Sequence, residues 1–114
     1  MAKYEDRFKG DFNELLRRIN DGILSGSVSA SFEDGSDYQS GSVRCAVRVY
    51  ERYSMMGSGR LSMAITLVCN EDDLFITAIT AGGSQAVFFK INTLGETSFL
   101  QRVVDIIEEY KRAR

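Results

Sequence analysis

The chain has 114 residues, with 14 basic and 16 acidic side chains and a net charge of −2, so its composition excludes a general attraction to nucleic acid or to an anionic membrane. A hydrophobic fraction of 44% and a charged fraction of 26% are typical of a globular protein and exclude a disordered or fibrous one. This length suits one domain, which we expect to span residues 1–114 and to bury about 65% of its unfolded surface.

The chain contains no histidine. Histidine is the side chain best suited to proton transfer near neutral pH and the commonest metal ligand, so Ser-His, Cys-His and His-metal mechanisms are excluded. Catalysis would have to rest on carboxylates, tyrosines or lysines, and strand or helix spacing places no acidic pair at a concave site. The sequence therefore favours binding over catalysis and predicts no catalytic residue, no metal and no cofactor.

The N-terminal segment is predicted to form an edge strand followed by a helix. The strand runs from Lys3 to Lys9. Asp11, followed three residues later by Glu14, has the form of a capping box at a helix N-terminus. The helix is expected to end at Asp21-Gly22, because glycine tolerates the left-handed conformation common just past a helix. Its buried side carries Phe12, Leu15, Leu16 and Ile19.

A second strand is predicted from Ser27 to Glu33, where apolar and polar side chains alternate. The segment from Asp34 to Gly41 is rich in Asp, Gly and Ser, so it is predicted to be a loop.

Three further strands are predicted between Val43 and Ala81, joined at Met55–Gly59 and at Asn70–Asp73. In the first of them, valines and Cys45 alternate with Arg44, Arg48 and Arg52. Because strand side chains alternate between two faces, we expect the valines to face the core and the arginines to point away from it. The second and third strands are expected over Leu61–Cys69 and Leu74–Ala81, the third with apolar residues on both sides.

Both cysteines, Cys45 and Cys69, fall on the sides of their strands predicted to be buried. We interpret them as small core residues. A disulfide between neighbouring strands and a reactive thiol remain open alternatives.

The C-terminal segment is predicted to contain a turn at Gly82–Ser84, a short strand at Ala86–Ile91 and a helix from about Leu94 to Lys111. Thr93 and Glu96 form a second capping-box pattern at the start of this helix.

The predicted order is β-α-β-β-β-β-β-α. Hairpin-length connections require antiparallel pairing, and two amphipathic helices can cover only one face of the sheet. We therefore expect an α+β two-layer sandwich, a curved antiparallel sheet of five to six strands with both helices on one face. This order, with its long closing helix, resembles a shortened helix-grip domain, in which such a sheet wraps around a C-terminal helix.

Two segments carry a family resemblance: R-C-A-V-R-V-Y-E-R-Y-S at Arg44–Ser54 and A-G-G-S-Q-A-V-F-F-K-I-N at Ala81–Asn92. They are similar to a small bacterial family of uncharacterised single-domain proteins. The resemblance implies no catalytic or binding residues.

The polar side of the sheet is the predicted functional surface. Guanidinium groups suit phosphate or carboxylate, and hydroxyl groups could complete an anion-binding or partner-binding face. The alternative is a solvated face whose arginines pair with nearby acidic residues. The residues predicted to share this face are Arg44, Arg48, Arg52, Tyr50, Ser62 and Thr66.

We predict a small cytoplasmic binding domain that forms a homodimer through the sheet face that the helices leave uncovered. Nucleic acid is not expected as a partner, and no stretch approaches the roughly 20 apolar residues that cross a bilayer. The residues expected to mediate association are Ala46, Ala64, Val68, Phe75, Ile79 and Ala81.

The alternative function is a carrier or sensor of an apolar or anionic small molecule, with a pocket between the C-terminal helix and the sheet. The same residues could instead fill an ordinary core. The expected lining is Phe32, Val47, Val49, Met63, Ile65, Phe89, Phe99 and Val103.

Overall fold

A computed structural model describes residues 1–27, 29–53, 59–82 and 89–114, with no side chains described for 89–97. Within these ranges, five strands and two helices follow one another. Their bounds are β1 (Ala2–Lys9), α1 (Phe12–Ser25), β2 (Ser31–Ser40), β3 (Val43–Tyr53), β4 (Arg60–Asn70), β5 (Asp73–Gly82) and α2 (Phe89–Arg112).

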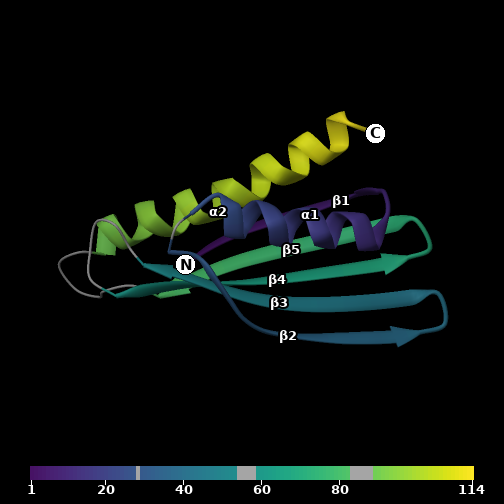
Figure 1. Ribbon diagram of the computed structural model, residues 1–114, viewed down its shortest axis with the longest axis horizontal. Helices are drawn as coiled ribbons and strands as arrows, with labels where there is room; N and C mark the ends of the chain where they lie inside the picture. Colours follow the sequence, from purple (N-terminus) through teal and green to yellow (C-terminus); the bar gives the residue numbers. More distant parts are fainter. Residues whose placement is uncertain (28, 54–58, 83–88) are drawn as a thin grey trace.

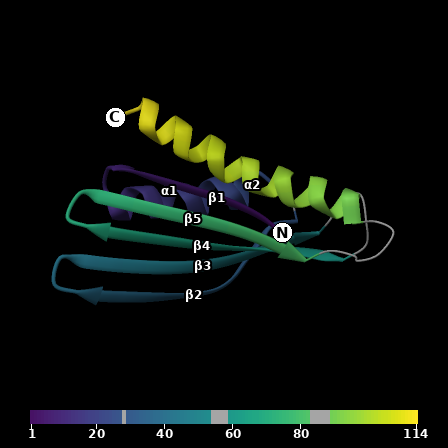
Figure 2. The same cartoon turned by 180° about the vertical axis from the view of Figure 1, so that it is seen from behind.

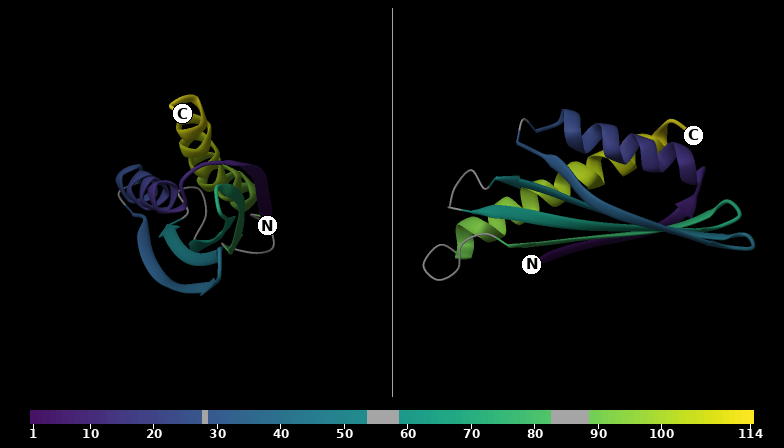
Figure 3. Two further views of the ribbon diagram at one scale, coloured as in Figure 1. Left: turned by 90° about the vertical axis from the view of Figure 1, so that its right-hand side faces the viewer. Right: turned by 60° about the horizontal axis from the view of Figure 1, so that its bottom comes forward.

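The strands form one antiparallel sheet in the order β1-β5-β4-β3-β2. Both helices lie on the same side of this sheet (Figures 1 and 2). Seen end-on and obliquely, the sheet is strongly twisted and α2 runs diagonally across it (Figure 3). The predicted α+β architecture, with two helices covering one face of an antiparallel sheet, is confirmed.

The core lies between the helices and the central strands. In β4, alternate residues from Leu61 to Cys69 are buried, as their spacing predicts. In β5 the buried residues are even-numbered, from Leu74 to Thr80, because the short turn at Asn70–Asp73 pairs odd-numbered residues of β4 with even-numbered residues of β5. The helices contribute Leu15, Ile19, Ile23, Phe99, Val103, Ile107 and Tyr110 to the same core.

The predicted orientation of β3 is wrong. Ala46 and Tyr50 are its fully buried residues. Both are even-numbered, like the arginines, so they lie on the same side of the strand as the arginines. The reason lies in the register with β4, in which Tyr50 pairs with Met63 and Arg44 pairs with Cys69. Because paired residues share a face and the odd-numbered residues of β4 face the core, the even-numbered residues of β3 must face it as well.

The predicted boundaries of β2 are also wrong. Most of the segment expected to be a loop, from Asp34 to Ser40, is an edge strand paired with β3, with a register shift between Phe32 and Asp34. Backbone pairing therefore outweighs the low strand propensity of Asp, Ser and Gly. The chain turns at Gly41, whose φ of +58° is one that glycine adopts without strain.

Helix α1 begins as predicted but ends three residues later. Asp11 is the N-cap, yet its side chain makes no capping hydrogen bond. Instead, the hydroxyl of Tyr110 accepts a hydrogen bond from the Asp11 backbone N–H at 2.8 Å. Gly22 lies inside the helix and does not end it. A Cβ at this position would lie 2.5 Å from Cδ1 of Ile106 in α2. Glycine at this position lets α1 and α2 pack closely.

Helix α2 begins earlier than predicted. Residues 89–91, assigned from sequence to the end of a strand, are helical, and Thr93 lies inside the helix, so the second capping box is not its start. Residues 83–88, with the rest of that strand and most of the Gly82–Ser84 turn, lie outside the described residues, as does most of the Met55–Gly59 connection.

Candidate functional site

The six residues predicted to form one polar face are divided between the two sides of the sheet. The four from β3 point toward the helices. Ser62 and Thr66 point the opposite way, since they alternate with the buried residues of β4. The interpretation that they share a face is therefore wrong. Their positions now define two separate surfaces: a helix-side surface with Arg44, Arg48, Tyr50 and Arg52, and an open face with Ser62 and Thr66.

The arginines on the helix side pack against aromatic rings and acidic groups. Cζ of Arg44 lies 4.3 Å from the ring centroid of Phe12 in α1, and Cζ of Arg52 lies 4.6 Å from that of Phe99 in α2. Arg48 donates to both carboxylate oxygens of Asp37, at 3.0 and 3.3 Å. Arg44 and Arg52 thus cover aromatic rings at the margin of the core, whereas Arg48 forms an ion pair with the edge strand β2.

Tyr50 lies fully buried on the same side of β3. Its hydroxyl donates to Oδ1 of Asn20 in α1 at 2.8 Å, and its ring meets that of Phe32 edge-on with centroids 5.8 Å apart. Burial raises the pKa of Tyr50 to about 12, a little offset by the nearby Arg48. This tyrosine anchors α1 to the sheet rather than contributing to an external binding face.

The open face carries apolar side chains at its centre. Its exposed large hydrophobic side chains are Phe75 (37%) and Ile79 (38%) on β5, Tyr38 (66%) on the edge strand β2, and Val43 (36%) and Tyr53 (60%) at the two ends of β3. The strand register arranges it in rows across the sheet, each row taking one residue from each strand. One row consists of Lys3, Ile79, Ala64, Val49 and Asp34, and another of Arg7, Phe75, Val68, Cys45 and Tyr38.

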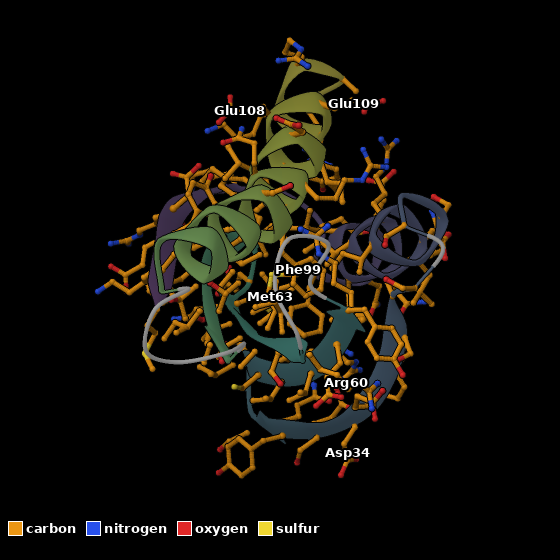
Figure 4. The ribbon with its side chains drawn as sticks, turned by 90° about the vertical axis from the view of Figure 1, so that its left-hand side faces the viewer. Asp34, Arg60, Met63, Phe99, Glu108 and Glu109 are labelled. Atoms are coloured by element: carbon orange, nitrogen blue, oxygen red, sulfur yellow. The ribbon has the colours of Figure 1, made fainter. Side chains whose placement is uncertain are left out.

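Figure 4 shows the two sides of the sheet in one view. Asp34 lies on the side away from the helices, whereas Met63 and Phe99 lie between the sheet and α2. Sequence reasoning missed the contribution of the β3 valines and Tyr38 to the open face. Their side depends on the registers of β3 with β4 and of β2 with β3, which no local pattern in the sequence reveals.

The two cysteines point to opposite faces. Cys45 lies half-buried on the open face, whereas Cys69 is 4% exposed in the core, and both are free thiols. A disulfide needs side chains directed toward each other, so the two cannot pair within one chain. The interpretation of Cys69 as a core residue is confirmed, and that of Cys45 is wrong.

The pocket predicted under the closing helix is largely filled by core. Met63, Ile65, Phe99 and Val103 are at most 1% exposed and pack into one cluster. Val47 and Val49 line the opposite face, because β3 has the other orientation. Phe32 is 47% exposed at the edge of the sheet, and the side chain of Phe89 lies outside the described residues.

Among the predicted association residues, Ala46 is wrongly placed. Ala46 is fully buried beneath the helices because it lies on the same side of β3 as Tyr50. The others lie on the open face: Ala64, Val68, Phe75, Ile79 and Ala81.

In the described residues, no helix is long and apolar enough to span a membrane. Within those same ranges, no three side chains of His, Cys, Asp or Glu gather as a metal site would require.

The fold and its exposed face define a two-layer α+β domain with an antiparallel sheet covered on one side only. Residues 1–111 match a family described as one of unknown function, DUF6054, and the chain belongs to that family. Comparisons with curated proteins and with solved structures gave no match.

Proposed function

We propose that this protein is a binding domain that associates with a second copy of itself through the open face of its sheet. The observation that carries the proposal is the apolar centre of this face. Phe75 and Ile79 of β5 are more than a third exposed there, across the central strand β4 from the valines of β3. Exposed apolar side chains gathered on one face of a sheet mark interaction sites, because covering them removes apolar surface from water.

The extent of the face suits a two-fold dimer. Five strands about 4.8 Å apart, each at least eight residues long at about 3.4 Å per residue, present roughly 650 Å² per subunit. Standard stable interfaces bury about 600–1,000 Å² per partner, so the face is at the lower end of this range. Packed face to face, two such sheets would lie about 10 Å apart with their strands nearly aligned.

The register also makes the face complementary to itself. The row through Ala64 begins with Lys3 on β1 and ends with Asp34 on β2. A two-fold axis along β4, the central strand, exchanges the two edges of the sheet. It therefore sets Lys3 against Asp34 of the partner subunit.

The same axis extends this match to the neighbouring positions. Ile79 faces Val49 of the partner subunit, and in the adjacent row Arg7 faces Tyr38 of the partner subunit. Opposite charges at the rim and apolar groups at the centre are the arrangement that favours a specific interface.

Sedimentation equilibrium of the full chain at high micromolar concentration tests the proposal. We expect a dimer for the wild type and a monomer for Ile79→Lys, because association would have to desolvate the new ammonium group. The matched control is Leu24→Lys, since Leu24 is also exposed (37%) but lies on α1, and this variant should still dimerise. A monomeric wild type, or an Ile79→Lys variant that associates as strongly as the control, would refute the proposal.

A further inference from the structure

A pocket of about 500 Å³ lies on the helix side of the sheet, away from the proposed interface. Three elements meet there: the C-terminal end of α1, the end of β3 and the first described side chains of α2. Its lining residues are Ile23, Gly26, Ser27, Arg52, Ser98, Phe99, Gln101, Arg102 and Asp105. This volume is within the range of pockets that hold small organic ligands.

The described lining residues carry a net positive charge. Two guanidinium groups face one carboxylate, that of Asp105, whose Oδ1 already accepts a hydrogen bond from Gln101 at 2.9 Å. The hydroxyls of Ser27 and Ser98 add donors. Such a set of donors recognises an anion rather than a cation or an apolar molecule.

Both guanidinium groups are held in place by neighbouring groups. Arg52 stacks on the buried ring of Phe99. Nε of Arg102 donates to the backbone oxygen of Gly22 at 3.0 Å, which uses one of the five N–H groups of its guanidinium. A Cβ on Gly26 would clash with this Nε, so glycine there leaves room for the arginine. Donors fixed in this way lose little conformational freedom when a ligand binds.

We infer that this pocket binds a small organic anion, a carboxylate or a phosphate ester, which contacts Arg52 and Arg102 through its charge. The inference does not depend on dimerisation, since the pocket and the open face lie on opposite sides of the sheet.

The test is an NMR titration of the ¹⁵N-labelled full chain with inorganic phosphate, phenyl phosphate and benzoate at constant ionic strength. We expect saturable shifts confined to backbone amides of the lining residues. A stronger response to phenyl phosphate than to benzoate assigns a phosphate ester, and the reverse assigns a carboxylate. If none of the three probes gives saturable shifts at these amides, the inference is wrong.

Two variants test the role of Arg102. Arg102→Gln should weaken binding by about tenfold or more, because a charge-assisted hydrogen bond is lost. Gly26→Ala should also weaken it by displacing the guanidinium. The control, Arg112→Gln, removes the same charge from an exposed position at the end of α2 and should bind like the wild type. Equal weakening by Arg112→Gln and Arg102→Gln would show non-specific attraction and overturn the inference.

Discussion

The guanidinium of Arg44 lies 4.3 Å from the ring centroid of Phe12, beneath the first turn of α1. This contact joins β3, whose orientation was predicted wrongly from the sequence, to α1, which covers it. Because β3 has this orientation, its valines lie on the open face and its arginines lie at the margin of the core.

Removing the Arg44 side chain should reduce stability. We expect Arg44→Ala to lower the free energy of unfolding by about 0.5–1 kcal/mol, through loss of the cation–π contact and of the packing of its stem. Urea denaturation measures this. Arg17→Ala, at an exposed position of α1, is the control and should change stability by less than about 0.5 kcal/mol. If the two variants were equally stable, Arg44 would not pack as described.

Gly22 should be intolerant of a side chain although it lies inside a helix. Alanine normally stabilises a helix by about 1 kcal/mol relative to glycine. Here we expect Gly22→Ala to destabilise by about 1–3 kcal/mol, because its Cβ would lie 2.5 Å from Cδ1 of Ile106. Thermal or urea unfolding measures the change. Ser25→Ala, exposed in the same helix, is the control and should be neutral or slightly stabilising.

A double variant tests the cause. Ile106→Val removes Cδ1, the atom that the new alanine Cβ would approach most closely, so combining it with Gly22→Ala should cost less than the sum of the two single changes. Strict additivity would show that the close approach of the helices is not the reason.

Glu71 should be replaceable with a gain in stability. It has a φ of +57° in the β4–β5 turn, a conformation that glycine adopts without strain and glutamate does not. We expect Glu71→Gly to stabilise by about 0.5–1 kcal/mol in urea denaturation. Asp72→Gly, next to it but without a positive φ, should not stabilise. A destabilised Glu71→Gly variant would contradict the described turn.

The sequence predicted the parts of the fold whose pattern is local. Alternation in β4, the short turn at Asn70–Asp73 and the apolar stripe of the closing helix were sufficient for the architecture. The sides of β3 could not be predicted, because they depend on which residue pairs with which across the β3–β4 hairpin. There Tyr53 pairs with Arg60, so odd-numbered residues of one strand share a face with even-numbered residues of the other.

The candidate site was predicted less well for the same reason. Arginine and tyrosine on one strand looked like a solvent-facing row, whereas long amphipathic side chains can also cover the edge of a core. The role of Gly22 was hidden as well, since a glycine that allows two helices to approach looks in sequence like one that ends a helix.

Tyr50 should titrate at unusually high pH. Burial raises its pKa from 10.0 to about 12, so the folded state holds this proton more tightly than the unfolded state does. Its contribution to stability is therefore fully present below pH 10 and is lost as the pH rises toward 12. The difference in tyrosinate absorbance between wild type and Tyr50→Phe should have its midpoint near 12. A midpoint near 10 would mean that the ring is not buried against α1.

The central claim, that the open face pairs with itself about an axis along β4, is tested most directly by exchanging the two charges at the ends of one row. Sedimentation equilibrium should show weaker dimers for Lys3→Asp and for Asp34→Lys, because each sets like charges together. The double variant should recover the wild-type dimer. If the wild type dimerises but the double variant dimerises no better than the single variants, this axis is wrong. If the wild type and all variants are monomeric, self-association itself is contradicted.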